Sequence, residues 1–506
     1  MVLEKLEPNV VWQIFETLLT RTPRESKKEA KIRTAITRWV ADLSKATSVA
    51  MTVNEDVAGN ILIRVPATHG MEACPPILLQ GHMDMVCETS RSGGFDFQNN
   101  AISVRIDKDG EWVSANGTTL GADNGIGVAL ALALIADRSK DMAHGPLELL
   151  FTVDEETGLT GAFALDTKSM GIQSRMMINL DSERMGYITI GSAGGGDMLF
   201  TKELSLTNRP RKDQHFLTIT VSGLQGGHSG MDISLPRANA NKVMARLLSL
   251  VSREAGLSFC FWNGGSKHNA IARDAEAKFG VPANKAAQVE QLLAGERAAL
   301  LAYYRSTVAG ATPLEPNMKI EWTKSDPGAT FAPDESSRIV STGNAIPCGP
   351  LRFSPDVPRL VETSCNFAIV KTEGSKILFH LSTRSSVDAE LEALRNSLTD
   401  IAMLAGWTVT KQPAYPGWKP LPSSPFLQYV KQHYESVAKQ KVEVVAIHAG
   451  LECGIIGARI PGIQMVSIGP TVTGAHSPDE KLRIADVAVF YRLLKTLLKS
   501  LPSLRL

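Results

Sequence analysis

Three adjacent carboxylates follow one apolar stretch of the chain. The run PLELLFTV predicts a buried strand, and Asp154, Glu155 and Glu156 come directly after it, before Gly158 breaks the pattern. Neighbouring side chains on an extended backbone point to opposite sides, so one of the two glutamates can bind a metal ion while the other acts on water. A solvated acidic turn is the alternative, because charge clusters often mark wet surface.

Two further apolar stretches end on side chains that could bind a metal. PPILLQGHMDMV leads to His82 and Asp84, which share one face of an extended segment, so Asp84 can fix the tautomer of His82. RMMINLDSE leads to Asp181. A histidine that only fills the core is the alternative for His82 taken alone. Because ligands of α/β sheets gather at the carboxyl ends of the strands, we expect these side chains to meet at one sheet edge.

Two more potential ligands lie outside the predicted strands. Asp123, in GADNGIG, precedes a strongly apolar helix whose positive N-terminal end favours a carboxylate, although a plain helix cap would look the same. The stretch is not expected to bind a nucleotide, because it lacks the G-x-G-x-x-G order and a Walker lysine. His476 lies in the loop before a predicted last helix, 484–501. Histidine and carboxylate ligands without thiolates suit Zn²⁺, with Mn²⁺ or Co²⁺ as alternatives.

Composition narrows the class of protein. The 506 residues are 43% hydrophobic and 21% charged, as expected for a globular chain of about three domain-equivalents. Its 53 basic and 52 acidic residues form no dense basic stripe, so we expect a small-molecule partner and neither nucleic acid nor an anionic membrane. Six scattered cysteines without a C-x-x-C pair suggest reduced thiols. With no signal peptide in MVLEKLEPNVVWQ and a longest apolar run, 128–136, too short to span a bilayer, we expect a cytoplasmic location.

Several elements must position these side chains. An amphipathic helix is expected around 10–19, and Ser26 with Glu29 predicts a capping box that starts a second helix. Strand patterns follow at 50–53 and 60–65. The stretch from Gly194 to about Ala414 has no HxD or DEE ligand pattern and reads as α+β, with helices around 239–253 and 287–304. Its two halves, on either side of Pro327, each resemble strand, helix, strand, strand.

Seven motifs together resemble one known family. GHMDMV, GADNGIG, DEETGLTGA, NLDSE, GGHSG, HAGLECG and GAHSPDE occur in the order found in aminoacyl-histidine dipeptidases (Xaa-His dipeptidases, carnosinase-like), a branch of the co-catalytic zinc metallopeptidases. The resemblance implies an α/β fold with a three-layer α/β/α, zinc-peptidase-like catalytic domain formed by residues 1–193 and 414–506. An α+β lid, dimerisation-like domain is implied over 194–413. Glu25 and Lys28 depart from the Pro and His that such relatives tend to show.

The resemblance also implies roles for the residues already singled out. One metal ion would be held by His82, Asp123 and Asp181, and the second by Asp123, Glu156 and His476. Glu155 matches the general base that deprotonates the shared water, and Asp84 matches the orienting acid. The resulting hydroxide would attack the peptide bond of a dipeptide.

Residues of the predicted lid match substrate-binding positions of the same family. His228, in GLQGGHSGMD, would polarise the scissile carbonyl, while Asn269 and Arg384 would hold the free carboxylate of the substrate. From the residues alone, His228 could only close a turn and Arg384 could be a surface charge. In HAGLECG, Glu452 could receive the α-amino group of the substrate, or His448 and Glu452 could simply pair with each other.

The predicted function is therefore metal-dependent hydrolysis of dipeptides, especially Xaa-His. An N-acyl amino acid deacylase would use the same constellation, because both reactions hydrolyse an amide beside a carboxylate. A metal-binding module without activity is the non-enzymatic alternative. A homodimer is compatible with the lid, but a lid that supplies His228 in cis would not require one.

Overall fold

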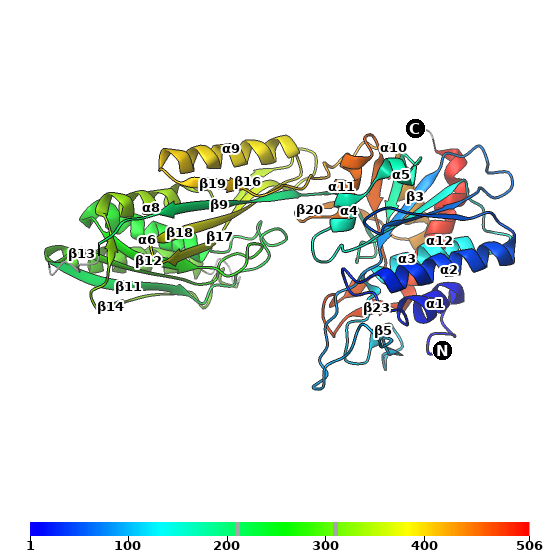
Figure 1. The fold of residues 1–506 in the computed structure, drawn as a ribbon, viewed down its shortest axis with the longest axis horizontal. Coiled ribbons are helices and arrows are strands. Elements are labelled where there is room, and N and C mark those ends of the chain that lie inside the picture. The colour runs from blue at the N-terminus through cyan, green and yellow to red at the C-terminus, as the bar shows by residue number, and fades with distance from the viewer. Residues whose placement is uncertain (208–212, 307–311, 505–506) are drawn as a thin grey trace. The chain divides into compact units, whose positions relative to one another are not determined.

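The structure is a computed structural model that describes residues 1–207, 213–306 and 312–504. The chain folds into two compact units (Figure 1). Unit 1 comprises Met1–Gly191, Pro420–Ala446 and Leu451–Leu506, and unit 2 comprises Ser192–Lys419 and Ile447–Gly450. The expected fold class, an α/β domain interrupted by an inserted α+β region, is confirmed.

Unit 1 is built on a sheet of strands in the order β1-β2-β6-β3-β7-β21-β8-β20. Its centre, from β6 through β3 and β7 to β21, is parallel. The strands are β1 (Thr52–Glu55), β2 (Ile61–Val65), β3 (Ile77–His82), β6 (Leu147–Thr152), β7 (Met176–Asn179), β8 (Tyr187–Ser192), β20 (Glu443–Ile447) and β21 (Gln464–Ser467). A smaller sheet pairs β22 (Val472–Thr473), β23 (Lys481–Arg483), β5 (Trp112–Ala115) and β4 (Val104–Ile106).

Helices cover both faces of the central sheet. Every residue of β3, β6 and β7 is buried, as expected for parallel strands with two covered faces. Successive residues of β3 point to opposite faces: Gln80 donates to Glu452 of α11, whereas a Cβ on Gly81 would lie 2.2 Å from Oδ1 of Asn124 in α3. The three-layer arrangement follows, and only glycine fits where β3 passes beneath the start of α3.

The helices of unit 1 largely follow the sequence pattern. They are α1 (Asn9–Ile14), the π-helix η1 (Phe15–Leu19), α2 (Ala30–Thr47), α3 (Ala122–Ala136), α4 (Thr160–Ala164), α5 (Thr167–Met170), α10 (Pro425–Ala438), α11 (Glu452–Arg459), α12 (Ile484–Ser500) and the 3₁₀ turn η3 (Leu501–Ser503). No helix among the described residues is long and apolar enough to cross a membrane.

The predicted capping box at the start of α2 is wrong. The helix begins at Ala30, and Glu29 occupies its N-cap position without a side-chain cap. The hydroxyl of Ser26 instead donates to Asp84, and Glu29 accepts the backbone N–H groups of Lys27 and Asp154. Both side chains are therefore used to fix the strand ends that carry the predicted ligands.

Unit 2 contains an antiparallel sheet in the order β14-β11-β13-β12-β17-β18-β9-β19, with β16 paired to β17. Its strands are β9 (Gly194–Glu203), β11 (Gln214–Ser222), β12 (Ser258–Gly264), β13 (Ala275–Pro282), β14 (Lys319–Lys324), β16 (Gly349–Phe353), β17 (Val361–Glu373), β18 (Lys376–Ser385) and β19 (Thr408–Lys411). A separate pair joins β10 (Leu206–Thr207) and β15 (Thr330–Phe331). The helical segments are α6 (Ala240–Ala255), η2 (Ala283–Lys285), α7 (Ala286–Tyr304), α8 (Pro333–Ala345) and α9 (Asp388–Leu404).

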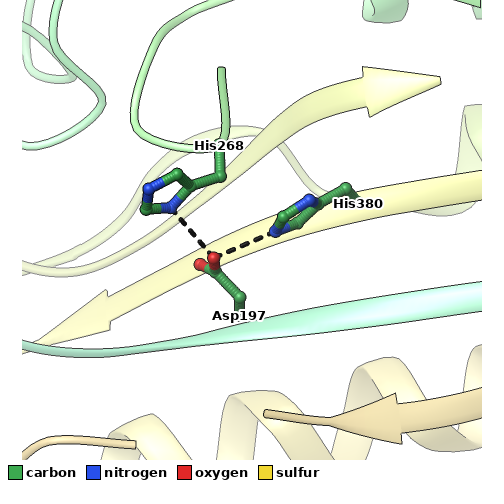
Figure 2. A group of neighbouring side chains, drawn as sticks. All are labelled: Asp197, His268 and His380. Carbon is green, nitrogen blue, oxygen red and sulfur yellow. Dashed lines mark hydrogen bonds and ion pairs between the residues drawn. The ribbon is translucent and has the colours of Figure 1, made fainter. Parts of the chain in front are cut away.

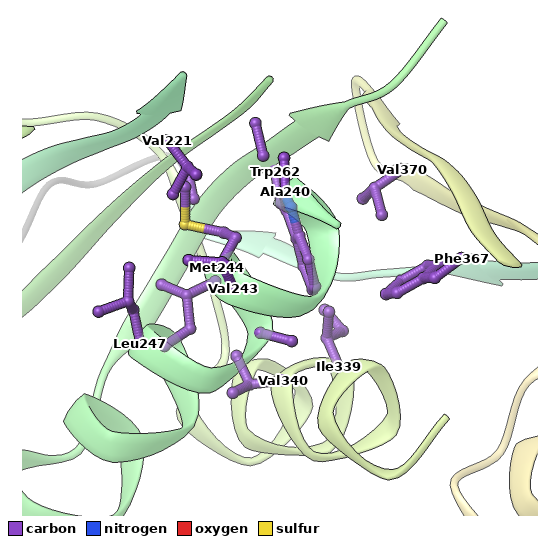
Figure 3. Close-up of a cluster of buried hydrophobic side chains, with 14 of the residues drawn as sticks. Val221, Ala240, Val243, Met244, Leu247, Trp262, Ile339, Val340, Phe367 and Val370 are labelled. Carbon is purple, nitrogen blue, oxygen red and sulfur yellow. The ribbon is translucent and has the colours of Figure 1, made fainter. Parts of the chain in front are cut away.

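One hydrophobic core joins this sheet to its helices. Figure 3 shows part of this core, in which Met244 and Leu247 of α6 and Val340 of α8 belong to the same cluster as the strand residues Trp262 and Phe367. Burying such side chains contributes roughly 1.5–3 kcal/mol each. The core explains why the inserted region forms a compact unit of its own.

Only one face of the sheet contributes to that core. Along β18, Phe379 and Leu381 belong to it, whereas His380 and Ser382 alternate with them and point to the opposite face. Asp197 of β9 pairs with Ser382 and therefore shares that second face. Polar side chains thus gather on the face of the sheet away from the helices.

Candidate metal centre

The predicted metal ligands of unit 1 meet at one edge of the central sheet. Four predicted site residues lie at or just after the ends of three neighbouring parallel strands. His82 is the last residue of β3, Glu155 and Glu156 follow β6, and Asp181 follows β7. Asp123 comes from the first turn of α3, where the backbone is not yet helical. His476 comes from the loop between β22 and β23. The convergence follows from the parallel order, since the carboxyl ends of parallel strands share one edge.

A first group consists of His82, Asp123 and Asp181. The Nε2 atom of His82 lies 3.0 Å from Oδ1 of Asp123 and 3.4 Å from Oδ1 of Asp181. All three ligand atoms lie within 4.8 Å of one another. The group is mostly buried, with side-chain exposures of 1%, 13% and 9%.

A second group shares Asp123 with the first. Nε2 of His476 lies 3.1 Å from Oδ2 of Asp123 and 2.9 Å from Oε2 of Glu156. Each oxygen of Asp123 therefore faces a different histidine. Oε1 of Glu156 is buried and has no hydrogen-bond partner among the described residues. A carboxylate between two imidazoles, beside an unpartnered carboxylate oxygen, is the donor set expected of two neighbouring cation sites.

Glu155 lies next to both groups but is not grouped with Asp123, the carboxylate that they share. One of its oxygens lies within 4.8 Å of the ligand atoms of His82 and Glu156. Burial raises its pKa well above the ordinary glutamate value; the charge of His82 lowers it, and the charges of Asp181 and Glu452 raise it further. A carboxyl group of this kind can hold a proton near neutral pH.

Asp84 connects the ends of β3 and β6. Its Oδ1 lies 3.3 Å from Nδ1 of His82 and accepts the backbone N–H of Glu155, and its Oδ2 accepts the backbone N–H of Glu156. Burial alone would raise the pKa of Asp84, but its contacts with His82 outweigh this effect and lower it to about 2. An ionised Asp84 therefore fixes the His82 ring and holds the backbone from which both glutamates project.

The carboxyl groups of the centre are crowded. Burial raises the pKa of Asp181 to about 6, with the charge of Asp123 among the further causes that raise it. Burial likewise raises the pKa of Glu183 to about 8, with the charges of Asp123 and Asp181 adding to it. Such repulsion is what bound dications relieve, so the residues present fit a pair of divalent metal ions.

Three residues of this centre were not anticipated from the sequence. Glu480 accepts the backbone N–H groups of Leu120, Gly121, Ala122 and Asp123, at 2.7–3.1 Å, and so holds the turn that carries Asp123. Fully buried Arg24 donates to the carbonyls of Met83, Asp84 and Gly121. Glu183 lies two residues after Asp181. The sequence could have indicated two of them, because Glu480 lies in SPDEKL and Glu183 is the second acid of NLDSE, but no motif marked Arg24.

Glu452 and His448 are each hydrogen-bonded within their own unit. Oε2 of Glu452, at the start of α11 in unit 1, accepts from Gln80 at 2.6 Å and from Thr152 at 2.8 Å. Burial raises the pKa of Glu452 to about 7. In unit 2, Nε2 of His448 bonds Oγ of Ser364 at 2.7 Å. These partners argue against the alternative that the two side chains simply pair.

Unit 2 brings three of the predicted substrate-binding residues close together. Nδ1 of His228 accepts the backbone N–H groups of Gly230 and Met231, which leaves its proton on Nε2. Burial lowers the pKa of His228, and the charge of Arg384 lowers it further. Burial and the same arginine lower the pKa of His448 to about 3. His228 is therefore a neutral imidazole with an Nε2–H donor at neutral pH.

Arg384 and Asn269 are held by different means. Nη1 of Arg384 donates to the hydroxyl of Tyr415 at 2.8 Å, while its Nε is buried without a hydrogen-bond partner among the described residues. Asn269 lies in the loop after β12, and its backbone carbonyl accepts the N–H of Ser229 at 2.8 Å. The alternative that Arg384 is a solvated surface charge is wrong, since only 7% of this residue is exposed.

Comparisons with known proteins identify the family of the chain. The sequence pattern of Peptidase family M20/M25/M40 matches residues 78–500. The cytosol non-specific dipeptidase of Escherichia coli (strain K12) is 38% identical over 506 residues, with 99% of each chain covered. The crystal structure of aminoacylhistidine dipeptidase from Vibrio alginolyticus matches with a TM-score of 0.90 at 35% identity, over 99% of this chain and 98% of that one.

A more distant structure shares the fold alone. Aminopeptidase PepT from Bacillus cereus matches with a TM-score of 0.55 at 17% identity, over 98% of this chain and 99% of that one. The family match covers most of the chain, and the similarity to the Escherichia coli protein covers nearly all of it. The chain therefore belongs to Peptidase family M20/M25/M40, which confirms the resemblance carried by its motifs.

Proposed function

We propose that this chain is a cytoplasmic dipeptidase that hydrolyses aminoacyl-histidine (Xaa-His, carnosine-like) dipeptides with the help of two divalent metal ions. The observation that carries the proposal is the pair of ligand groups that share Asp123 and lie beside Glu155. The names of the two most similar proteins reported above, a cytosol non-specific dipeptidase and an aminoacylhistidine dipeptidase, support the substrate class and the location.

Each ligand group would hold one ion, Zn²⁺ being the first candidate and Mn²⁺ or Co²⁺ the alternatives. His82, Asp123 and Asp181 would bind the first ion, and Asp123, Glu156 and His476 the second. Such a pair would supply the positive charge that activates water and polarises a carbonyl. Two dications would also balance the carboxylates that repel one another here.

Glu155 would act as the general base and then as the general acid. It would take a proton from the attacking water and deliver it to the nitrogen of the leaving amino acid. The effect of burial on its pKa favours this shuttle near neutral pH. Asp84 would act through position, since it holds the backbone N–H of Glu155 and the ring of His82.

Residues of unit 2 would bind and polarise the substrate. His228 would donate its Nε2–H to the scissile carbonyl as negative charge develops on the oxygen, an interaction worth a few kcal/mol in comparable sites. Arg384 and Asn269 would hold the free carboxylate, for which a guanidinium offers two parallel donors. Of the other predicted substrate-binding residues, Glu452 of unit 1 would receive the α-amino group, and His448 of unit 2 would contact the substrate. A homodimer is compatible with these roles.

Replacement of Glu155 tests the assignment of the base. Glu155→Gln should lower kcat by about 10²–10⁴-fold, because the amide cannot accept the proton. The zinc content of the purified variant should equal that of the wild type by mass spectrometry. Glu111→Gln, which changes an exposed glutamate, is the matched control. Near-wild-type turnover by Glu155→Gln, with metal bound, would show that another group is the base.

Substrate comparison separates the proposed activity from deacylation. Histidine release from carnosine and alanyl-histidine should exceed acetate release from acetyl-histidine by at least tenfold in kcat/KM. The opposite ranking would identify the chain as an N-acyl amino acid deacylase with the same metal constellation. No turnover of either substrate in the presence of added Zn²⁺, Mn²⁺ or Co²⁺ would leave a metal-binding module without activity.

A further inference from the structure

A second histidine–carboxylate cluster lies entirely within unit 2. Nδ1 of His268 and Nε2 of His380 each lie 2.9 Å from the same oxygen, Oδ2 of Asp197. Figure 2 shows both imidazole rings directed toward this carboxylate. The rings lie 5.9 Å apart between centroids and are inclined by 18°. Three potential ligand atoms thus converge on one small volume, all within 4.8 Å of one another.

The three residues come from separate segments that the fold holds in place. Asp197 lies on β9 and His380 on the neighbouring β18, on the sheet face away from the helices. His268 lies in the loop 265–274, which folds over this face: the carbonyl of Ala270 accepts from Asn366 of β17 at 2.8 Å. Two ligands therefore rest on paired strands, so most of the cluster is preorganised before any ion binds.

We propose that Asp197, His268 and His380 bind a divalent transition-metal ion of the zinc class, which clamps the loop 265–274 to the sheet of unit 2. This site is distinct from the two ligand groups of unit 1 and does not depend on the function proposed for them.

The donor set and its spacing select this class of ion. Two imidazoles and one carboxylate suit Zn²⁺ or Co²⁺, whereas Ca²⁺ and Mg²⁺ require more oxygen ligands. Tetrahedral Zn²⁺ with bonds near 2.0–2.1 Å places its ligand atoms about 3.3 Å apart. The two observed 2.9 Å separations from Oδ2 of Asp197 need only a few tenths of an ångström of expansion, and the two nitrogens lie within 4.8 Å of each other. A water molecule would complete the tetrahedron, since His268 is 55% exposed.

The carboxylate is also anchored beside the two histidines. The side chain of Asp197 is hydrogen-bonded to Ser382 as well. An anchored carboxylate beside two imidazoles matches the support that bound metals usually have.

Binding would order a loop that leads to His228. The residue after His268, Asn269, accepts from the N–H of Ser229, and His228 forms a β-bridge with Ala270. A metal at His268 would therefore restrain the loop 265–274 and the segment that carries His228. Hydrogen exchange by mass spectrometry of the full-length protein should show slower exchange across 265–274 when Zn²⁺ is added to metal-free wild type.

Metal counting on full-length variants tests the proposal. Metal-free protein is dialysed against micromolar Zn²⁺, and bound zinc is measured per chain. His380→Ala should bind one zinc fewer than wild type, whatever number unit 1 holds. His215→Ala is the matched control, because His215 faces Glu290 at 3.7 Å within unit 2 and belongs to none of the three-ligand groups found among the described residues. It should retain the wild-type number.

A second variant separates metal binding from a plain ion pair. His268→Arg preserves a positive partner for Asp197, but a guanidinium does not lose its proton to bind a metal. It should lose the same single zinc and the zinc-dependent slowing of exchange. Equal zinc content in wild type, His380→Ala and His268→Arg would overturn the proposal and leave the cluster as an ion pair only. Loss of zinc from His215→Ala as well would overturn it too.

Discussion

At the scale of single residues, Asp84 serves several partners at once. One carboxylate faces the His82 ring, accepts two backbone N–H groups from the end of β6 and accepts the hydroxyl of Ser26. Its side chain is completely buried. A buried anion in this position is stable only because each oxygen has donors, so its removal affects geometry and stability together.

Asp84→Asn keeps the size of this side chain but removes its charge and one of its acceptors. We expect metal affinity to fall about 10–100-fold, because the His82 ring loses its anionic partner. The unpaired backbone N–H should cost roughly 1–3 kcal/mol of unfolding free energy. Competition with a chelator and urea denaturation measure the two effects. Ser26→Ala, which removes only a hydroxyl donor, is the control, and equal metal affinity in Asp84→Asn and wild type would contradict the role.

Residue types after strands were the predictable part of the candidate site. His82, Glu155 and Asp181 follow apolar runs, and the physics of parallel sheets brings such positions together. Glu480 was not predictable, because its acceptor role depends on backbone N–H groups about 360 residues earlier in the chain. Arg24 was missed for the same reason, since its three carbonyl partners come from other segments. Local pattern carries no information about such distant contacts.

At the scale of elements, the start of α3 depends on another part of the chain. Glu480 binds four successive N–H groups there, where a helix normally leaves its donors unsatisfied. Burial raises the pKa of Glu480, although these hydrogen bonds oppose the shift. The turn that presents Asp123 to both ligand groups is therefore fixed by a residue four positions after His476.

Glu480→Gln should loosen this turn without changing its volume. An amide offers one acceptor oxygen in place of two, so some of the four N–H groups lose their partner, at roughly 1–3 kcal/mol. Because Asp123 is shared, zinc affinity should fall at both unit 1 groups together. Asp479→Asn, an exposed neighbour, is the control. Loss of only one of the two zinc ions would contradict a shared effect through Asp123.

The opposite end of α3 is tied to α12 by Asp137. This residue accepts from Tyr491 at 2.9 Å and Lys495 at 2.8 Å. Burial alone would raise its pKa, but the hydrogen bonds from Lys495 and Ser139 lower it to about 2. Because the pKa of Asp137 is lower in the folded state than its unfolded value of about 3.9, the ionised side chain stabilises the protein at pH values above that unfolded pKa. This stability is lost as pH falls toward 2.

Asp137→Asn should remove that part of the acid sensitivity. In metal-free protein at pH 6, the unfolding free energy of wild type should exceed that of the variant by on the order of 1 kcal/mol. This difference should shrink between about pH 4 and pH 2. Urea denaturation across this range measures it. Asp141→Asn, at an exposed aspartate nearby, should show no such convergence. A difference that stays constant down to pH 2 would contradict the assignment.

Element boundaries were predicted well where periodicity was strong. The helices expected at 239–253 and 484–501 correspond to α6 and α12. The helix expected from Ser26 begins only at Ala30. The capping pattern predicted the wrong start because Ser26 donates to Asp84 and Glu29 accepts the N–H of Asp154. No local sequence pattern reveals these contacts.

At the scale of the whole molecule, the chain contains two separately packed units. The inserted position of unit 2 was predictable, because the region lacks the ligand patterns that flank it. The inclusion of Ile447–Gly450 in unit 2 was not, since it depends on contacts such as that between His448 and Ser364. Each unit encloses its own buried residues, so each can unfold as a cooperative block.

Calorimetry of the metal-free protein should therefore resolve two transitions. Leu79→Ala, in the core of unit 1, and Leu247→Ala, in the core of unit 2, should each lower one transition, at a cost of about 2–5 kcal/mol. Zinc at 100 times its dissociation constant should add about 2.7 kcal/mol to any unit that binds it. Zinc should thus raise both transitions in wild type. In His476→Ala it should raise the unit 2 transition as in wild type and the unit 1 transition by less, and in His380→Ala it should raise only the unit 1 transition. A single transition, moved equally by both leucine variants, would show that the units unfold together and that binding in one stabilises the other.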